Sequence, residues 1–141
     1  VDFAHTPGAL RAVLMSLKSK SGRIIIVLGA AGNKDKSKRP EMGKIACTYA
    51  DHVIFTSEDP RNENPSAIIK EMTRATAARN YEIIINRNTA LREAISRAKA
   101  GDIVIITGKG NDKYFEENNK VYAYSDIAEV RKALGERKKR G

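Results

Sequence analysis

Three polar segments of this chain follow three short apolar runs. The segments are GAAGNKDKSKRP (29–40), TSEDPRNENP (56–65) and TGKGND (107–112), and the runs before them are RIIIVL (23–28), HVIF (52–55) and DIVII (102–106). Short, uninterrupted, β-branched runs are typical of strands that are covered on both faces. In an open parallel sheet, ligands bind beyond the carboxyl ends of the strands. The three segments are therefore predicted to form one composite binding site.

The distribution of charge indicates what such a site would bind. The chain carries a formal net charge of +9, but residues 131–141 hold six basic residues against Glu136 alone. We expect this terminal run to be a frayed, solvated tail. The remaining excess is concentrated in the first polar segment, where three lysines and Arg39 face only Asp35. A basic loop at a strand end suits a small anionic ligand at least as well as a polymer.

The elements that must position these segments alternate along the chain. Helices are expected over 7–18, 40–49, 65–78, 89–100 and from 126 onward, and strands over 23–28, 52–55, 81–85 and 102–106. The predicted helix caps are Thr6, Asn64, Asn88 and Ser125, and the last helix is expected to turn Ile127, Val130 and Leu134 inward. YFEEN and KVYAY suggest a C-terminal hairpin turned by Asn118 and Asn119. This alternation predicts an α/β three-layer sandwich with a mostly parallel, doubly wound sheet.

Length and composition exclude several classes of protein. A chain of 141 residues with 41% hydrophobic residues fits one domain with a single core. It has no apolar run long enough for a membrane span and no signal-peptide pattern at its start, so a cytoplasmic location is expected. The lone Cys47 lies in an apolar helical stretch and is expected to be buried. The patterns G-x-G-x-x-G and G-x-x-x-x-G-K-[ST] are absent, which argues against a dinucleotide site and against an ATP-cradling loop.

Four motifs resemble one known family in order and spacing. VDFAHTP (1–7), GNKDKSKRPEMG (32–43), SEDPRNENP (57–65) and GKGND (108–112) are similar to the C-terminal domain of the Mur ligases, above all those that add a diamino acid to UDP-N-acetylmuramoyl-L-alanyl-D-glutamate in peptidoglycan synthesis. The resemblance covers nearly the whole chain. It implies that residues 1–141 are the Rossmann-like C-terminal domain of a three-domain enzyme.

The resemblance also implies cofactors and partners. The other two domains would be an N-terminal domain for the UDP-sugar and a central ATPase domain that carries the phosphate loop and the magnesium ligands. ATP and Mg²⁺ are therefore the expected cofactors, with no catalytic residue and no metal ligand in this domain. We expect the isolated domain to be inactive. Its expected partners are UDP-MurNAc-dipeptide, a diamino acid and the enzyme's own two other domains.

The family motifs assign roles to individual residues. The expected contacts to ATP come from Asp2, His5, Asn33, Lys38 and Arg39, with the first two in an Asp-x-x-His element. The expected contacts to the amino acid come from Lys34, Glu58, Asp59, Pro60, Arg61, Gly108 and Asp112. A guanidinium can bind a carboxylate bidentately, and a carboxylate can pair with an ammonium group.

Departures from the family pattern leave the amino acid open. Asp59 replaces an asparagine, Asp112 a glutamate and Lys34 an arginine. The extra negative charge of Asp59 favours an ammonium group and hence lysine or ornithine. Arg61 favours meso-2,6-diaminopimelate, which has a distal carboxylate for a guanidinium to bind. We favour meso-diaminopimelate.

Two other functions compete with this interpretation. A basic α/β module that binds nucleic acid through the first segment and the tail would explain the charge, but not the EDPR and GKGND segments. The related folate polyglutamylating enzyme has a similar start, but the DKSKRP and DPR segments argue against it.

Overall fold

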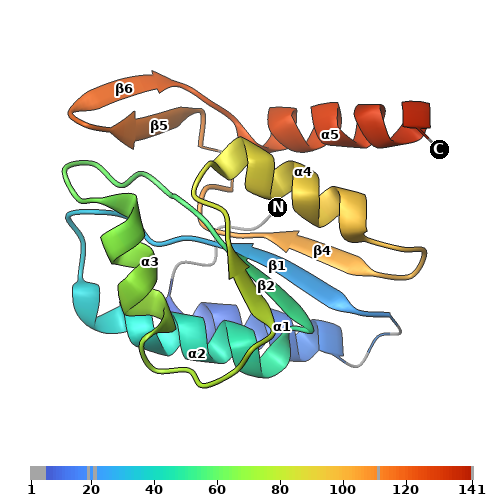
Figure 1. Ribbon diagram of the computed structural model, residues 1–141, viewed down its shortest axis with the longest axis horizontal. Helices are drawn as coiled ribbons and strands as arrows, with labels where there is room; N and C mark the ends of the chain where they lie inside the picture. The colour runs from blue at the N-terminus through green and yellow to red at the C-terminus, as the bar shows by residue number, and fades with distance from the viewer. Residues whose placement is uncertain (1–5, 19, 21, 111, 141) are drawn as a thin grey trace.

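The computed structural model describes residues 6–18, 20, 22–110 and 112–140. Four parallel strands form its central sheet in the order β3-β2-β1-β4 (Figure 1). These strands are β1 (Ile24–Leu28), β2 (His52–Phe55), β3 (Tyr81–Ile83) and β4 (Ile103–Ile106). The first strand, β1, lies inside the sheet. Strands β2 and β3 follow outward on one side of it, and β4 lies on its other side. The switch point between β1 and β4 is where a doubly wound sheet binds ligands.

Helices cover both faces of the sheet and complete the predicted three layers (Figure 1). The helices on one face are α1 (Pro7–Lys18), α2 (Arg39–Tyr49), which follows a 3₁₀ turn at Lys36–Lys38, and α3 (Pro65–Thr73). The helices on the other face are α4 (Arg87–Arg97) and α5 (Asp126–Arg140). The hairpin of β5 (Tyr114–Glu117) and β6 (Lys120–Ala123) forms a separate antiparallel pair next to α5 (Figure 1). The predicted fold class and hairpin are confirmed.

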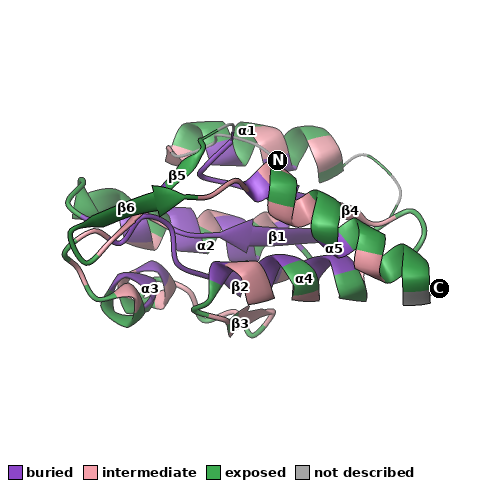
Figure 2. Cartoon of the chain, turned by 90° about the horizontal axis from the view of Figure 1, so that it is seen from above, coloured by how far each residue is buried: buried purple, intermediate pink, exposed green. Residues whose placement is uncertain are grey.

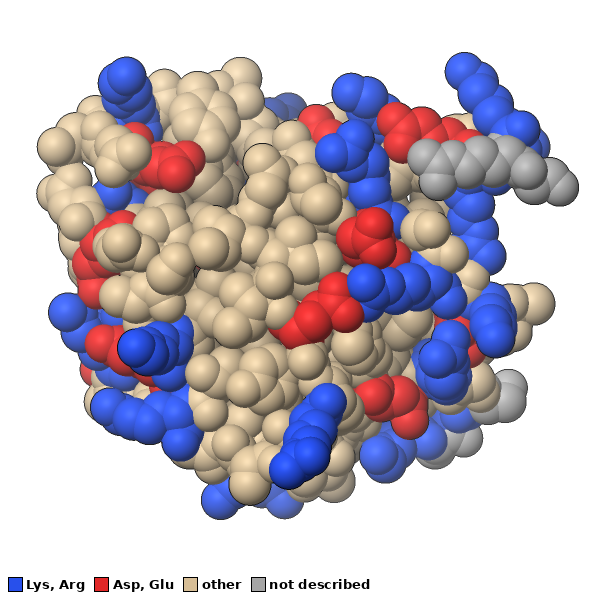
Figure 3. All heavy atoms as spheres, in the orientation of Figure 1, with Lys and Arg blue, Asp and Glu red and all other residues tan. Residues whose placement is uncertain are grey.

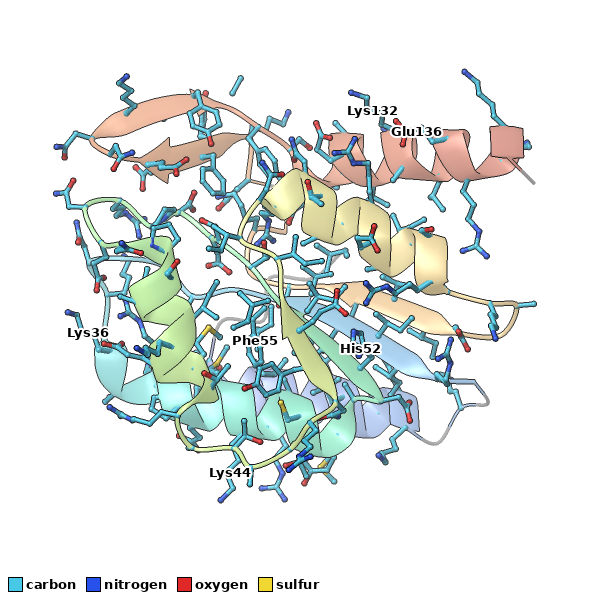
Figure 4. The ribbon with its side chains drawn as sticks, in the orientation of Figure 1. Lys36, Lys44, His52, Phe55, Lys132 and Glu136 are labelled. Atoms are coloured by element: carbon cyan, nitrogen blue, oxygen red, sulfur yellow. The ribbon has the colours of Figure 1, made fainter. Side chains whose placement is uncertain are left out.

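Two apolar clusters form the core, one on each face of the sheet. Every residue of β1 is buried (Figure 2), and alternate residues of the strand enter different clusters because side chains of a strand alternate in direction. Ile24, Ile26 and Leu28 pack with helices α1, α2 and α3. Phe55 extends the same cluster, and its ring meets that of Tyr81 edge-on at 5.3 Å (Figure 4). The core therefore fixes the strand ends from both sides. Cys47 is buried in this core as predicted, and burial raises the pKa of its thiol.

Most of the predicted caps are present. The Thr6 hydroxyl accepts a hydrogen bond from the backbone N–H of Ala9, Asn64 accepts one from that of Ser66, and Ser125 accepts one from that of Ala128. In the hairpin, Asn118 and Asn119 have φ angles of 51° and 61°, as a tight two-residue turn requires.

Four predicted boundaries are wrong, and one of them is the end of α4, which lies at Arg97 rather than near residue 100. Helix α3 ends at Thr73 rather than near residue 78. Beyond it, the Thr76 hydroxyl accepts a hydrogen bond from the backbone N–H of Ala78, which competes with a helical hydrogen bond. Helix α4 begins two residues early, since Asn86 and not Asn88 accepts the N–H of Thr89. Strand β3 ends at residue 83, where its partner strand β2 also ends.

The predicted frayed tail is also wrong. Helix α5 continues to residue 140, and the Arg137 guanidinium donates to the carbonyls of Ile95 and Ala98 at the end of α4. Of the residues predicted to face inward, Val130 packs against the core and Ile127 is half-buried, but Leu134 is 51% exposed and Ala133 is buried instead. Most of helix α5 is exposed (Figure 2), and many of its residues are charged. In the described part of the chain, no helix combines the length and apolar character of a membrane span.

Candidate functional site

A cavity of about 410 Å³ lies at the carboxyl ends of β1, β2 and β4, where the three polar segments meet. Eight predicted site residues line it: Lys34, Lys38, Arg39, Glu58, Asp59, Arg61, Gly108 and Asp112. Asn33 and Pro60 belong to the same segments but do not line the cavity. Asp2 and His5 lie outside the described residues. The structure therefore assembles the predicted composite site from segments that are far apart in sequence.

Glu58 is the buried acid of this cavity. Its side chain is 6% exposed, and its Oε1 has no hydrogen-bond partner among the described residues. Burial raises the pKa of its carboxyl to about 7, against the opposing pull of the Arg87 guanidinium. Gly108 makes room for it: with φ of +104°, a Cβ there would lie 1.6 Å from Oε1. An unpaired carboxyl in such a position can pair with a cation of a ligand.

Asp59 is not an isolated negative charge, contrary to the expectation from the sequence. Its Oδ2 lies 2.5 Å from Nζ of Lys109, which is 1% exposed, and its Oδ1 accepts the backbone N–H of Glu116. The same ammonium lies 3.6 Å from Asp112 and 5.6 Å from the Phe115 ring centroid. The lysine of GKGND is therefore a structural member of the site that sequence reasoning missed, because nothing in the sequence shows it to be buried. Because Lys109 pairs with Asp59, the negative charge of Asp59 is a weaker argument for lysine or ornithine as the bound amino acid.

Arg61 is held in place by the hairpin and by the first segment. Its Nε lies 2.7 Å from a carboxylate oxygen of Glu116, and its Nη1 donates to the carbonyl of Gly32 at 2.8 Å. Backbone hydrogen bonds join Arg61 to Glu116 and Asn118. Its Nη2 donates to none of the described residues. The guanidinium is thus fixed in orientation and keeps N–H groups for a carboxylate in the cavity.

Arg39, a predicted nucleotide contact, is held in a network of ion pairs at the edge of the cavity. Its guanidinium is 2% exposed and bonds Glu63, Glu71 and the carbonyl of Ala31. This arginine is the main reason that the pKa of Glu63 falls to about 2. Glu63 also accepts the backbone N–H of Asn33, so the network fixes the first polar segment. The exposed cations Lys34 and Lys38 remain at the cavity.

A buried ion pair behind the cavity, between Arg87 and Asp126, was not predicted from the sequence. The Arg87 guanidinium bonds Asp126 at 2.7 and 2.8 Å and donates to the carbonyls of Ser57 and Thr107. Both partners of the pair are buried. The hydroxyl of Tyr124 donates to Asp126, and burial first of all raises the pKa of that hydroxyl. The pair ties the ends of β2 and β4 to α5.

Charged loops at the switch point of a parallel sheet define an α/β ligand-binding domain. The family model described as Mur ligase, glutamate ligase domain, matches residues 1–110, and the chain belongs to the Mur ligase family. It is 41% identical over 135 residues to the UDP-N-acetylmuramoyl-L-alanyl-D-glutamate–2,6-diaminopimelate ligase of Bacillus cereus, and 42% identical over 139 residues to that of Chlorobium phaeobacteroides. These matches cover 95% and 96% of the chain but only 28% and 27% of the relatives.

Solved structures give the same result. A UDP-N-acetylmuramoyl-L-alanyl-D-glutamate–2,6-diaminopimelate ligase superimposes with a TM-score of 0.90 at 38% identity, over 96% of this chain and 28% of that one. A MurF ligase from Thermotoga maritima in complex with ADP superimposes with a TM-score of 0.61 over 99% of this chain and 28% of that one. Its 17% identity supports the fold alone.

The face of the molecule in Figure 3 gives little support to a nucleic-acid interface. On the face in Figure 3, lysines and arginines are scattered around the edge and interspersed with acidic side chains. A polymer-binding surface needs a basic stripe. The described residues also contain no group of three potential metal ligands among His, Cys, Asp and Glu.

Proposed function

We propose that this chain is the amino-acid-binding domain of an ATP-dependent ligase. The ligase would join a diamino acid, meso-2,6-diaminopimelate, to the glutamate of UDP-N-acetylmuramoyl-L-alanyl-D-glutamate in peptidoglycan synthesis. The proposal is supported by relatives of that name at about 41% identity. It also has support from one observation in the site: a single cavity holds an unpaired buried acid, Glu58, together with the fixed guanidinium of Arg61.

The cavity is complementary to a molecule that carries both ammonium and carboxylate groups. Glu58 can pair with an ammonium group, and the free N–H groups of Arg61 can bind a carboxylate. Lys34 and Lys38 add positive charge at the cavity. Lysine and ornithine lack the distal carboxylate that Arg61 would bind, which is why we favour meso-diaminopimelate.

The domain's task in the reaction is to position the amine. ATP supplies the phosphoryl group that activates the glutamate carboxylate as an acyl phosphate. The amine nitrogen then attacks the acyl carbon, the bond from that carbon to the phosphate oxygen breaks, inorganic phosphate leaves, and the amine loses a proton. Holding both ends of the amino acid keeps the nitrogen within attack distance. Lys38, an exposed cation at the cavity, fits a contact to ATP phosphates.

Ligand titration of the chain tests this assignment. We expect meso-diaminopimelate to bind more tightly than L-lysine in isothermal titration calorimetry. Arg61→Ala should weaken the binding of meso-diaminopimelate by about tenfold or more, because a charge-assisted hydrogen bond contributes about 1.5–3 kcal/mol to the binding free energy. L-Lysine is the matched control ligand. Any general damage from losing the contacts to Glu116 and Gly32 would reduce the affinities for both ligands, whereas loss of the contact to the distal carboxylate would reduce only the affinity for meso-diaminopimelate. Equal losses for the two ligands would refute the role of Arg61.

A further inference from the structure

A second cavity, of about 380 Å³, lies between the hairpin and the start of α4. Ser57, Ile85, Asn88, Phe115, Glu117 and Tyr122 are among the residues that line it. No residue lines both cavities, although Ser57 and Glu58 are neighbours in sequence and each lines one. The second cavity is therefore distinct from the one to which the function above is assigned.

Two residues of its lining, Ser57 and Asn88, each carry a buried polar atom without a hydrogen-bond partner among the described residues. The Ser57 side chain is 7% exposed, and neither its Oγ nor Oδ1 of Asn88 has a hydrogen bond to any described residue. Leaving a buried polar atom unsatisfied costs about 1–3 kcal/mol, so native structures supply a partner. Two such atoms in one cavity indicate a polar occupant.

The charges around the cavity favour a cation. Glu117 supplies a carboxylate, which accepts the Tyr122 hydroxyl at 3.3 Å. Arg87 in the lining is paired with Asp126, and Lys109 next to Phe115 is paired with Asp59. Lys120, which lies opposite Glu117 in the hairpin, does not line the cavity. The backbone N–H groups at the start of α4 would attract an anion, but an anion would meet Glu117 and no unpaired lysine or arginine in the lining.

The apolar part of the lining defines the rest of the ligand. The rings of Phe115 and Tyr122 lie 5.5 Å apart and tilted by 31°, and Ile85 completes the wall. Aromatic faces attract cations, and they also bury aliphatic stems. We propose that this cavity is a binding site for a small organic cation, with a primary ammonium at Glu117, Asn88 and Ser57 and an apolar stem against Phe115, Tyr122 and Ile85.

An NMR titration of the chain with n-butylammonium chloride tests the site. The amide signals of Ser57, Asn88 and Tyr122 should shift saturably, whereas sodium butyrate and n-butanol should leave them in place. Glu117→Gln should weaken the binding by about two- to fivefold, as expected for loss of one partly exposed charge contact. Glu41→Gln, which removes an exposed carboxylate at the start of α2, is the matched control and should bind like the unaltered chain.

Glu58→Gln separates the two cavities. This change should leave the n-butylammonium shifts at Ser57 and Asn88 intact even though it removes the acid of the first cavity. Shifts that disappear with Glu58→Gln would place the cation in the first cavity and overturn the proposal. So would saturable shifts by butyrate, which would make the cavity an anion site, or no saturable shift at all, in which case water alone satisfies Ser57 and Asn88.

Discussion

At the scale of single residues, the candidate site includes an acid that weakens the fold at neutral pH. Glu58 has a pKa of about 7 in the folded chain, against a reference value of 4.5, and burial is the largest cause. Between these values the folded state keeps a proton that the unfolded state has lost. The stability present below about pH 4.5 is therefore lost as pH rises through about 7. The full loss is on the order of 3 kcal/mol.

Replacing Glu58 by glutamine should remove this penalty. We expect the free energy of unfolding of Glu58→Gln to exceed that of the unaltered chain by a margin that grows from pH 5 to pH 8. Urea unfolding at both pH values measures it, and parallel changes in the two proteins would contradict the raised pKa. The same variant should bind the diamino acid less well, because glutamine offers no charge to an ammonium group.

Residue identities at the site were predictable where a motif carried them. Lys34, Glu58 and Arg61 stand in segments whose types and spacing indicate ligand contacts, and the structure gathers them around one cavity. Lys109 and Arg87 were not predictable, because burial and pairing with carboxylates distant in sequence have no local signature.

At the scale of elements, one ion pair fastens α5 to the sheet. Asp126, the first residue of that helix, holds the Arg87 guanidinium, which in turn reaches the ends of β2 and β4. Breaking a buried pair leaves an uncompensated charge, which is far more costly than losing an exposed one. The polar site thus depends on a contact made behind it.

Asp126→Asn should lower the free energy of unfolding by about 3 kcal/mol or more, as measured by urea denaturation. The control is Glu136→Gln on the same helix (Figure 4), which removes a carboxylate without a described ion pair and should change stability by less than about 0.5 kcal/mol. A similar small effect for both variants would mean that the pair contributes nothing to stability.

The strand positions and the helix caps at Thr6, Asn64 and Ser125 were predictable from the sequence, but the start of α4 and the ends of α3 and α5 were not. A side-chain cap decides a boundary, and Asn86 and Asn88 are equally suitable by residue type. Helix α5 extends beyond its prediction because Arg137 reaches the free carbonyls at the end of α4, a contact between elements that no local pattern shows.

At the scale of the whole molecule, the chain spans about 28% of the relatives that it matches. It carries no phosphate-loop pattern. We therefore expect the chain alone neither to hydrolyse ATP nor to form the amide, whereas a complete ligase should do both when given UDP-MurNAc-dipeptide and meso-diaminopimelate. A phosphate-release assay on both proteins measures this, and ATP turnover by residues 1–141 alone would contradict the proposed division of tasks.

The reach of Arg87 also sets the order in which the site can form during synthesis on the ribosome. Its partners Ser57, Thr107 and Asp126 emerge at widely separated times, and β4 must insert beside β1 before Thr107 is in place. Until residue 126 has left the exit tunnel, the guanidinium lacks its counter-ion and Glu58 has no finished pocket. The binding site can therefore be completed only after residue 126 has emerged, later than α1, β1, α2 and β2.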